Sequence, residues 1–323
     1  MRILAHLACA LALAAAPAAA TPKASSHLEL VDLTPAFAAA WERTAAMPEA
    51  ERVEAFDAAF ATVLPGFYDP ARFKSPEGAE RYRARLLKSL AAFPAARAGI
   101  EDVSHRFSGM FQPAIASFEA RFGPMTGYPP VYLVHSLGEF DGGTRDLPQG
   151  SRLLFGADVI ARIHAGHDIQ PFFHHELFHI YHARAFHDCE AVWCSLWEEG
   201  LAVYVASQLN PHASDDELLL TVPEPIRPEV EADRAAAVCA VAQRLDSTDE
   251  KDLSALFSSG RLSAGLPPRF GYYVGFLVAG ELGKTRSLEQ LAKLDREQAR
   301  PLVEAALHRL ADCSQRGRPT PRS

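Results

Sequence analysis

FFHHELFH at residues 172–179 is the stretch that decides how the rest of this 323-residue chain can be interpreted. It contains the pattern HExxH, in which His175 and His179 are four residues apart. On an α-helix such residues lie on one face, so both imidazoles can reach a single metal ion. Glu176 projects about 100° away from His175, which places its carboxylate beside the metal, where it can take a proton from water. The stretch therefore predicts a metal-binding helix that also carries a general base.

A third metal ligand is expected, because catalytic zinc sites of this kind use three protein ligands and keep the fourth position for water. In the metzincin pattern the third ligand is a histidine six residues beyond the second, but that position is Ala185. WEEGLAVY at residues 197–204 instead supplies a carboxylate on a following helix, after the intervening residues 180–198. This arrangement resembles the gluzincins, namely thermolysin-like peptidases, gluzincin aminopeptidases and predicted bacterial zinc proteases. The resemblance extends over about residues 131–279.

The resemblance implies one zinc ion (Zn2+) per chain, held by His175, His179 and the glutamate directly before a glycine, which is Glu199. Glu198 then occupies a non-ligand position. We expect the glycine after Glu199 to let the second ligand helix approach the first one closely. The chain departs from the pattern at Val203, where thermolysin-like enzymes carry an aspartate that orients the first histidine. The sequence therefore does not identify the partner of that imidazole.

Further site residues follow from the same resemblance. Gluzincin aminopeptidases use a downstream tyrosine as a donor to the developing oxyanion, and this role falls first to Tyr272, then to Tyr273, with Arg269 a weaker candidate. In gluzincins the outer strand of the sheet lies beside the active-site helix and pairs with an extended substrate, and residues 153–156 are our candidate for this strand. The resemblance thus implies a zinc peptidase acting on a peptide or protein substrate, with Glu176 as general base.

Two other functions are compatible with the same residues. One is a non-peptidase zinc hydrolase, such as an amidase or an epoxide-opening enzyme, because the residues themselves indicate only zinc-assisted hydrolysis. The other is a non-catalytic binding module that zinc stabilises.

The other histidines near the motif are weighed separately. His182 lies on the same helix face as the two predicted ligands and is a candidate supporting residue beside the metal. His164, His167 and His174 are expected to be solvated or structural.

The first residues have the composition of a secretory signal peptide. Arg2 precedes an uncharged apolar run at 3–15, and the alanines at 18–20 offer a cleavage site before Thr21. The run is too short to span a membrane. We therefore predict a signal peptide at 1–20 and an exported mature protein, periplasmic or secreted, without a membrane span. The alternative is an uncleaved amphipathic anchor.

Cysteine usage agrees with export. Cys189, Cys194, Cys239 and Cys313 remain after the leader, and an even number in an exported protein predicts disulfides, with three possible connectivities. We favour Cys189–Cys194 and Cys239–Cys313. No C-x-x-C pair supports a cysteine metal site.

Composition and charge exclude some partners. With 48% hydrophobic and 22% charged residues, the chain has the composition of a globular protein. Its formal net charge of -8 argues against nucleic acid or an anionic membrane as a partner. Nothing in the sequence indicates an oligomeric state.

The chain divides into an N-terminal helical region at 21–125 and a zinc-binding catalytic domain at 126–323. Pro35, Pro48 and Pro76 are placed where a first helical turn tolerates proline, and aromatic residues repeating at i+4 behind them predict core packing. The sequence leaves open whether this region is an inhibitory pro-segment or a permanent part of the fold.

Candidate strands in the second region lie at 131–134 and 151–156, on either side of a turn-rich stretch at 138–150, and a hairpin or small antiparallel sheet is the simplest interpretation. Helical patterns occupy the remainder, and Ser287 to Gln290 forms a capping box. The predicted fold class is α+β, mostly α: a gluzincin-like catalytic core with a small antiparallel sheet and an N-terminal helical region. The helices are predicted at 169–185, 196–209, 228–245, 268–282 and 298–311.

Overall fold

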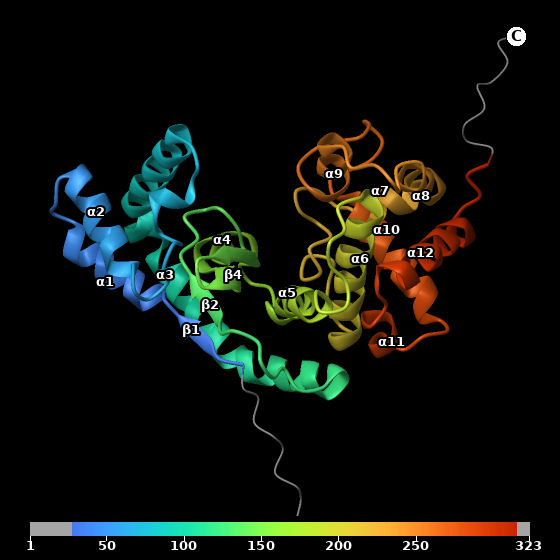
Figure 1. Cartoon of the computed structure of the whole chain (residues 1–323), viewed down its shortest axis with the longest axis horizontal. Helices are drawn as coiled ribbons and strands as arrows, with labels where there is room; N and C mark the ends of the chain where they lie inside the picture. Colours follow the sequence, from blue (N-terminus) through green and yellow to red (C-terminus); the bar gives the residue numbers. More distant parts are fainter. Residues whose placement is uncertain (1–27, 315–323) are drawn as a thin grey trace, which may run out of the picture.

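A computed structural model of the chain describes residues 28–314, so the predicted signal peptide lies outside the described residues. Helices dominate the fold and a four-stranded sheet accompanies them (Figure 1), which confirms the class α+β, mostly α. The helices are α1 (Thr34–Thr44), α2 (Glu49–Phe60), the short 3-10 helix η1 (Pro70–Arg72), α3 (Pro76–Phe122), α4 (Ala157–Ile163), α5 (Gln170–His182), α6 (Val192–Leu209), α7 (Arg227–Ala232), α8 (Arg234–Ala242), α9 (Glu250–Phe257), α10 (Phe270–Gly283), α11 (Leu288–Ala292) and α12 (Arg296–Leu310).

The sheet is mixed, so the predicted small antiparallel sheet is wrong. Its strands lie in the order β1 (Leu30–Asp32), β2 (Val131–Val134), β4 (Gly150–Gly156) and β3 (Gly142–Leu147). The two strands expected to form a hairpin, β2 and β4, pair in parallel, and only β3 runs antiparallel to β4. The hairpin partner of β4 is thus part of the turn-rich stretch. Its glycines weaken the strand signal, and pairing with β4 overrides that weak local preference.

The outer strand beside the metal helix is β3, not residues 153–156, which lie in the interior strand β4. A Cβ added at Gly142, the first residue of β3, would come within 2.6 Å of the Phe172 ring and 3.0 Å of Glu176 Cγ. Glycine is therefore required where this strand approaches α5.

The N-terminal helical region shares its core with the rest of the chain. It contributes β1, a strand that we did not predict, which pairs with β2. The long helix α3 bends along its course (Figure 1) and contains Pro94 and Pro113, residues that interrupt helix hydrogen bonding. Rings of α3, such as Phe107, lie 4.9 Å from Phe155 of β4 and 5.7 Å from Phe173 of α5. The aromatic repeats are core, as predicted.

Two glycines allow α6 and α10 to pack closely. A Cβ on Gly200 would meet backbone atoms of Gly275 at 2.2 and 2.3 Å, and a Cβ on Gly275 would meet Leu196 O at 2.3 Å. The expectation that Gly200 faces the first ligand helix is therefore wrong, because it faces α10.

Both favoured disulfides are present. Cys189–Cys194 closes a short loop between α5 and α6, and Cys239–Cys313 joins α8 to the segment after α12. Among the helices of residues 28–314, none combines the length and apolarity needed to cross a bilayer.

The glycine contact gives a test of the packing. We expect Gly275→Ala to lower the free energy of unfolding by about 1–3 kcal/mol or more, because backbone atoms of α6 cannot move away from the added methyl group. Gly280→Ala, in the same helix, is the matched control: its Cβ would meet only Tyr204 Cε2, at 3.8 Å. That variant should be neutral or gain about 0.5–1 kcal/mol of stability. Urea denaturation measures both, and equal effects would contradict the assigned contact.

The disulfides should differ in their contribution to stability. Replacing Cys239 and Cys313 with serine releases a loop of 74 residues and should cost about 4 kcal/mol. Replacing Cys189 and Cys194 releases a separation of 5 residues and should cost about 2 kcal/mol, because a short loop restricts the unfolded chain less. Thermal and urea unfolding of the two double variants measure both losses of stability. A larger loss in the Cys189/Cys194 variant would contradict the prediction.

Candidate metal centre

The two helices that carry the predicted ligands, α5 and α6, are joined at both ends. The Cys189–Cys194 disulfide holds the connection between them. At the opposite end, Gln170 at the start of α5 donates through Nε2 to the side-chain oxygen of Asn210, the residue after α6, at 3.0 Å. The helices therefore lie side by side and run in opposite directions, with the predicted ligands between the two ties.

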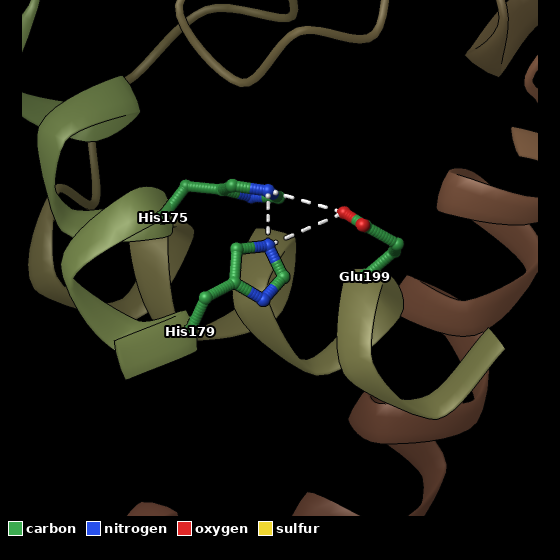
Figure 2. A group of neighbouring side chains, drawn as sticks. All are labelled: His175, His179 and Glu199. Carbon is green, nitrogen blue, oxygen red and sulfur yellow. Dashed lines mark hydrogen bonds and ion pairs between the residues drawn. The ribbon is translucent and has the colours of Figure 1, made fainter. Parts of the chain in front are cut away.

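His175, His179 and Glu199 meet between these helices (Figure 2). Glu199 Oε2 lies 3.3 Å from His175 Nε2 and 3.4 Å from His179 Nε2, and the two nitrogens are 3.0 Å apart. Tetrahedral ligands at about 2.0–2.1 Å from a zinc ion are about 3.3 Å apart, which is close to these separations. Glu199 Oε2 is buried without a hydrogen-bond partner among the described residues. These three side chains, called the metal group below, could therefore hold one metal ion.

The charges of the group are coupled. Burial opposes ionisation of Glu199, but His179 and the contacts to both imidazoles hold the pKa of that carboxyl well below its usual range. Burial also opposes the charged form of His179, yet the Glu199 carboxylate outweighs it and raises the pKa of His179 to about 9. Burial lowers the pKa of His175. Since a metal ligand must be deprotonated, metal binding would displace a proton from His179.

His174, next to the first ligand, fixes the position of α5. Its ring is fully buried, its Nε2 lies 3.0 Å from Ser117 Oγ and 3.1 Å from Ala114 O of α3, and its Nδ1 accepts from Asn210 Nδ2 at 2.9 Å. The expected structural role is confirmed. One imidazole thus joins three parts of the fold beside the metal group.

The other histidines are not ligands of this group. His182 is buried between Phe178 and Phe186, with ring centroids at 5.1 and 5.2 Å. Burial lowers its pKa to about 3, so the ring is neutral and acts as core. His164 is buried too, and its Nε2 lies 3.2 Å from Asp141 Oδ2. His167 is half-buried.

A cavity of about 480 Å³ opens over the metal group. Glu176, Tyr272 and Arg269 line it together with the three predicted ligands. Its other lining residues are Asp141, Gly142, Leu219, Val222, Pro223, Phe257, Ser258 and Ser259. In the described part of the chain this lining begins at Asp141, so the N-terminal helical region supports α5 from behind and does not cover the cavity.

The pKa values of Glu176 and Tyr272 are both raised. Burial raises the pKa of Glu176 to about 7, near the value that suits a group that gives and takes protons at neutral pH. Burial and the Glu199 carboxylate raise the pKa of Tyr272 well above its usual value, so its hydroxyl keeps its proton and can donate. The Tyr273 hydroxyl instead donates to Glu231 Oε1 at 2.6 Å, and Tyr273 does not line the cavity.

Several lining residues were not found from the sequence. Asp141 and Gly142 lie at the start of β3, and the Asp-Gly-Gly string that contains them was interpreted only as a turn signal. Leu219, Val222 and Pro223 come from a connecting segment, and Phe257 ends α9 directly before Ser258 and Ser259. None of them belongs to a motif. The position of the aspartate expected from thermolysin-like enzymes is the buried Val203, which offers no acceptor.

Comparisons with known proteins found no match for this chain. No family model, no curated protein and no solved structure matches it.

Metal content tests the ligand assignment. We expect Glu199→Ala to lose the metal that the wild-type protein retains, because the ion loses its only anionic ligand, whereas Glu198→Ala should retain it. Elemental analysis of the purified proteins measures metal per chain. Retention in Glu199→Ala, or an equal loss in the matched neighbour, would contradict the assignment.

Because His179 must give up a proton, metal affinity should also fall as the pH is lowered.

Proposed function

We propose that this chain is an exported zinc-dependent hydrolase with a gluzincin-type site, and that its substrates are peptides or proteins. The observation that carries the proposal is the placement of Glu176 in one cavity with the His175, His179 and Glu199 group. Two imidazoles and a carboxylate are the donor set of catalytic zinc in several peptidases. The two disulfides fit an oxidising compartment, in agreement with the signal peptide expected at residues 1–20.

The roles of the chain's own groups follow from their positions. Zinc held by such ligands acts as a Lewis acid and makes water a nucleophile near neutral pH. Glu176 takes the proton of the attacking water and returns it to the leaving amine nitrogen, as its pKa of about 7 permits. The protonated Tyr272 hydroxyl donates to the oxygen on which negative charge develops.

An extended peptide is the substrate shape that the surroundings favour. Among residues 28–314, strand β3 pairs only with β4, so its other edge can accept a further strand. Its first residue, Gly142, lines the cavity and lies against Glu176. A peptide bound along β3 would therefore pass beside the general base and the metal group.

Glu176→Gln tests whether the site is catalytic. The variant should bind metal as the wild type does and lose about 100- to 10,000-fold of its turnover, since glutamine cannot accept the proton. Digestion of a peptide library, with the products identified by mass spectrometry, measures the turnover, and Glu198→Gln is the matched control.

The alternatives predict other outcomes. Cleavage of esters or small amides, with no peptide products, would indicate a non-peptidase hydrolase. If Glu176→Gln equals the wild type in every assay while the metal stabilises the fold, the chain is a zinc-stabilised binding module and the proposal is wrong.

A further inference from the structure

Arg269 is the one arginine or lysine among the described residues that line the metal cavity. The other charged lining residues outside the two imidazoles are carboxylates: Asp141, Glu176 and Glu199. We propose that Arg269 is the specificity-determining residue of the site and binds a carboxylate of the ligand. The inference rests on the proposed function and narrows it to peptides with a carboxylate close to the cleaved bond.

The backbone and contacts of Arg269 hold its side chain in place. The residue precedes α10 with φ 63° and ψ 13°, a left-handed conformation that costs a non-glycine residue about 1–2 kcal/mol. Its Nη1 donates to Val222 O at 3.0 Å, and its guanidinium carbon lies 4.4 Å from the centroid of the Tyr272 ring. These two contacts fix the plane of a group that has five N–H donors, so donors remain for a ligand.

Arg269 differs from its neighbours in having no carboxylate partner. Arg227 pairs with Asp215 at 2.8 Å, and Arg261 pairs with Glu224 at 2.6 Å. Within residues 28–314, no ion pair is formed by Arg269, although it is half-buried. A half-buried guanidinium without an anion retains its capacity to bind one, and a carboxylate matches its fork geometry with two parallel hydrogen bonds.

The position of Arg269 relates the bound carboxylate to the reacting atoms. Its guanidinium lies on the ring of Tyr272, which is 6.3 Å from the ring of His175. A carboxylate on Arg269 would therefore lie within about three residues of a bond placed over the metal group, given about 3.3–3.6 Å per extended residue. The carboxylate is the C-terminus of a peptide or an acidic side chain.

The experiment uses metal-loaded protein with Glu176→Gln, so that ligands bind without being cleaved. Calorimetry compares three peptides: acetyl-Ala-Ala with a free C-terminus, its C-terminal amide, and the amide of acetyl-Ala-Asp. At least one acid should bind roughly 10- to 100-fold more tightly than the neutral amide, which is the difference expected for charged hydrogen bonds. The free acid identifies a terminal carboxylate, and the aspartyl amide identifies a side chain.

Arg269→Gln should abolish this preference and leave the affinity of the neutral amide unchanged. Arg269→Lys keeps the charge but not the fork, so it should retain part of the preference. Arg309→Gln is the control, because Arg309 lies on α12, outside the cavity lining, where it pairs with Glu281. Equal weakening of acids and amide would mean that Arg269 only positions Tyr272, which overturns the proposal.

A misfolded variant does not prevent a decision. Metal content and thermal unfolding identify such a variant. The proposal is then decided on the Glu176→Gln protein alone: if neither acid binds more tightly than the neutral amide, the proposal is overturned. Failure of the proposed function is distinguishable. If the wild type cleaves acidic and neutral peptides equally, the inference alone fails. If it cleaves nothing while the carboxylate preference and its dependence on Arg269 remain, the hydrolase proposal alone fails.

Discussion

The contact of the Glu199 carboxylate with two imidazoles is the interaction on which the site depends. A buried carboxylate is costly unless positive charge accompanies it. Here the imidazole of His179 supplies that charge, and the pKa shifts of both groups record the attraction. A divalent cation fits the same position, because the three ligand atoms already have nearly the separations that tetrahedral coordination needs.

The two histidines and Glu199 are held in place by packing on two sides, around α5 and around α6. On one side, α3 and the sheet support α5 through edge-to-face and tilted contacts of phenylalanine rings and through the hydrogen bonds of His174. On the other, α10 supports α6 where Gly200 meets Gly275. The same helix α10 carries Tyr272, so the helix that positions the carboxylate ligand also delivers the candidate oxyanion donor. The cavity lies where these two sides meet the outer strand β3.

The sequence predicted the features that depend on local spacing. The interval of four between His175 and His179 fixes one helix face, and the closeness of Cys189 to Cys194 in the sequence favours that disulfide. Once that pair is assigned, Cys239 and Cys313 are the two cysteines that remain after the leader. Features set by distant partners were not predictable. Strand β2 pairs in parallel with β4, and its other edge pairs with β1, which lies about a hundred residues earlier and is three residues long. Likewise, nothing local indicates that Gly200 faces α10 or that Asp141 reaches the cavity.

The links at both ends of the α5–α6 pair have a consequence for how a metal ion would bind between these helices. Zinc fingers order their ligands only when zinc arrives, so a chelator unfolds them. Here the segment between α5 and α6, which Cys189–Cys194 ties to the start of α6, joins the ligand helices at one end, and the Gln170–Asn210 hydrogen bond joins them at the other. A fold that orders the two ligand helices before coordination would lose less entropy when an ion binds. Metal binding at such a preformed site would depend on the supply of ions rather than on folding of the chain around the ion.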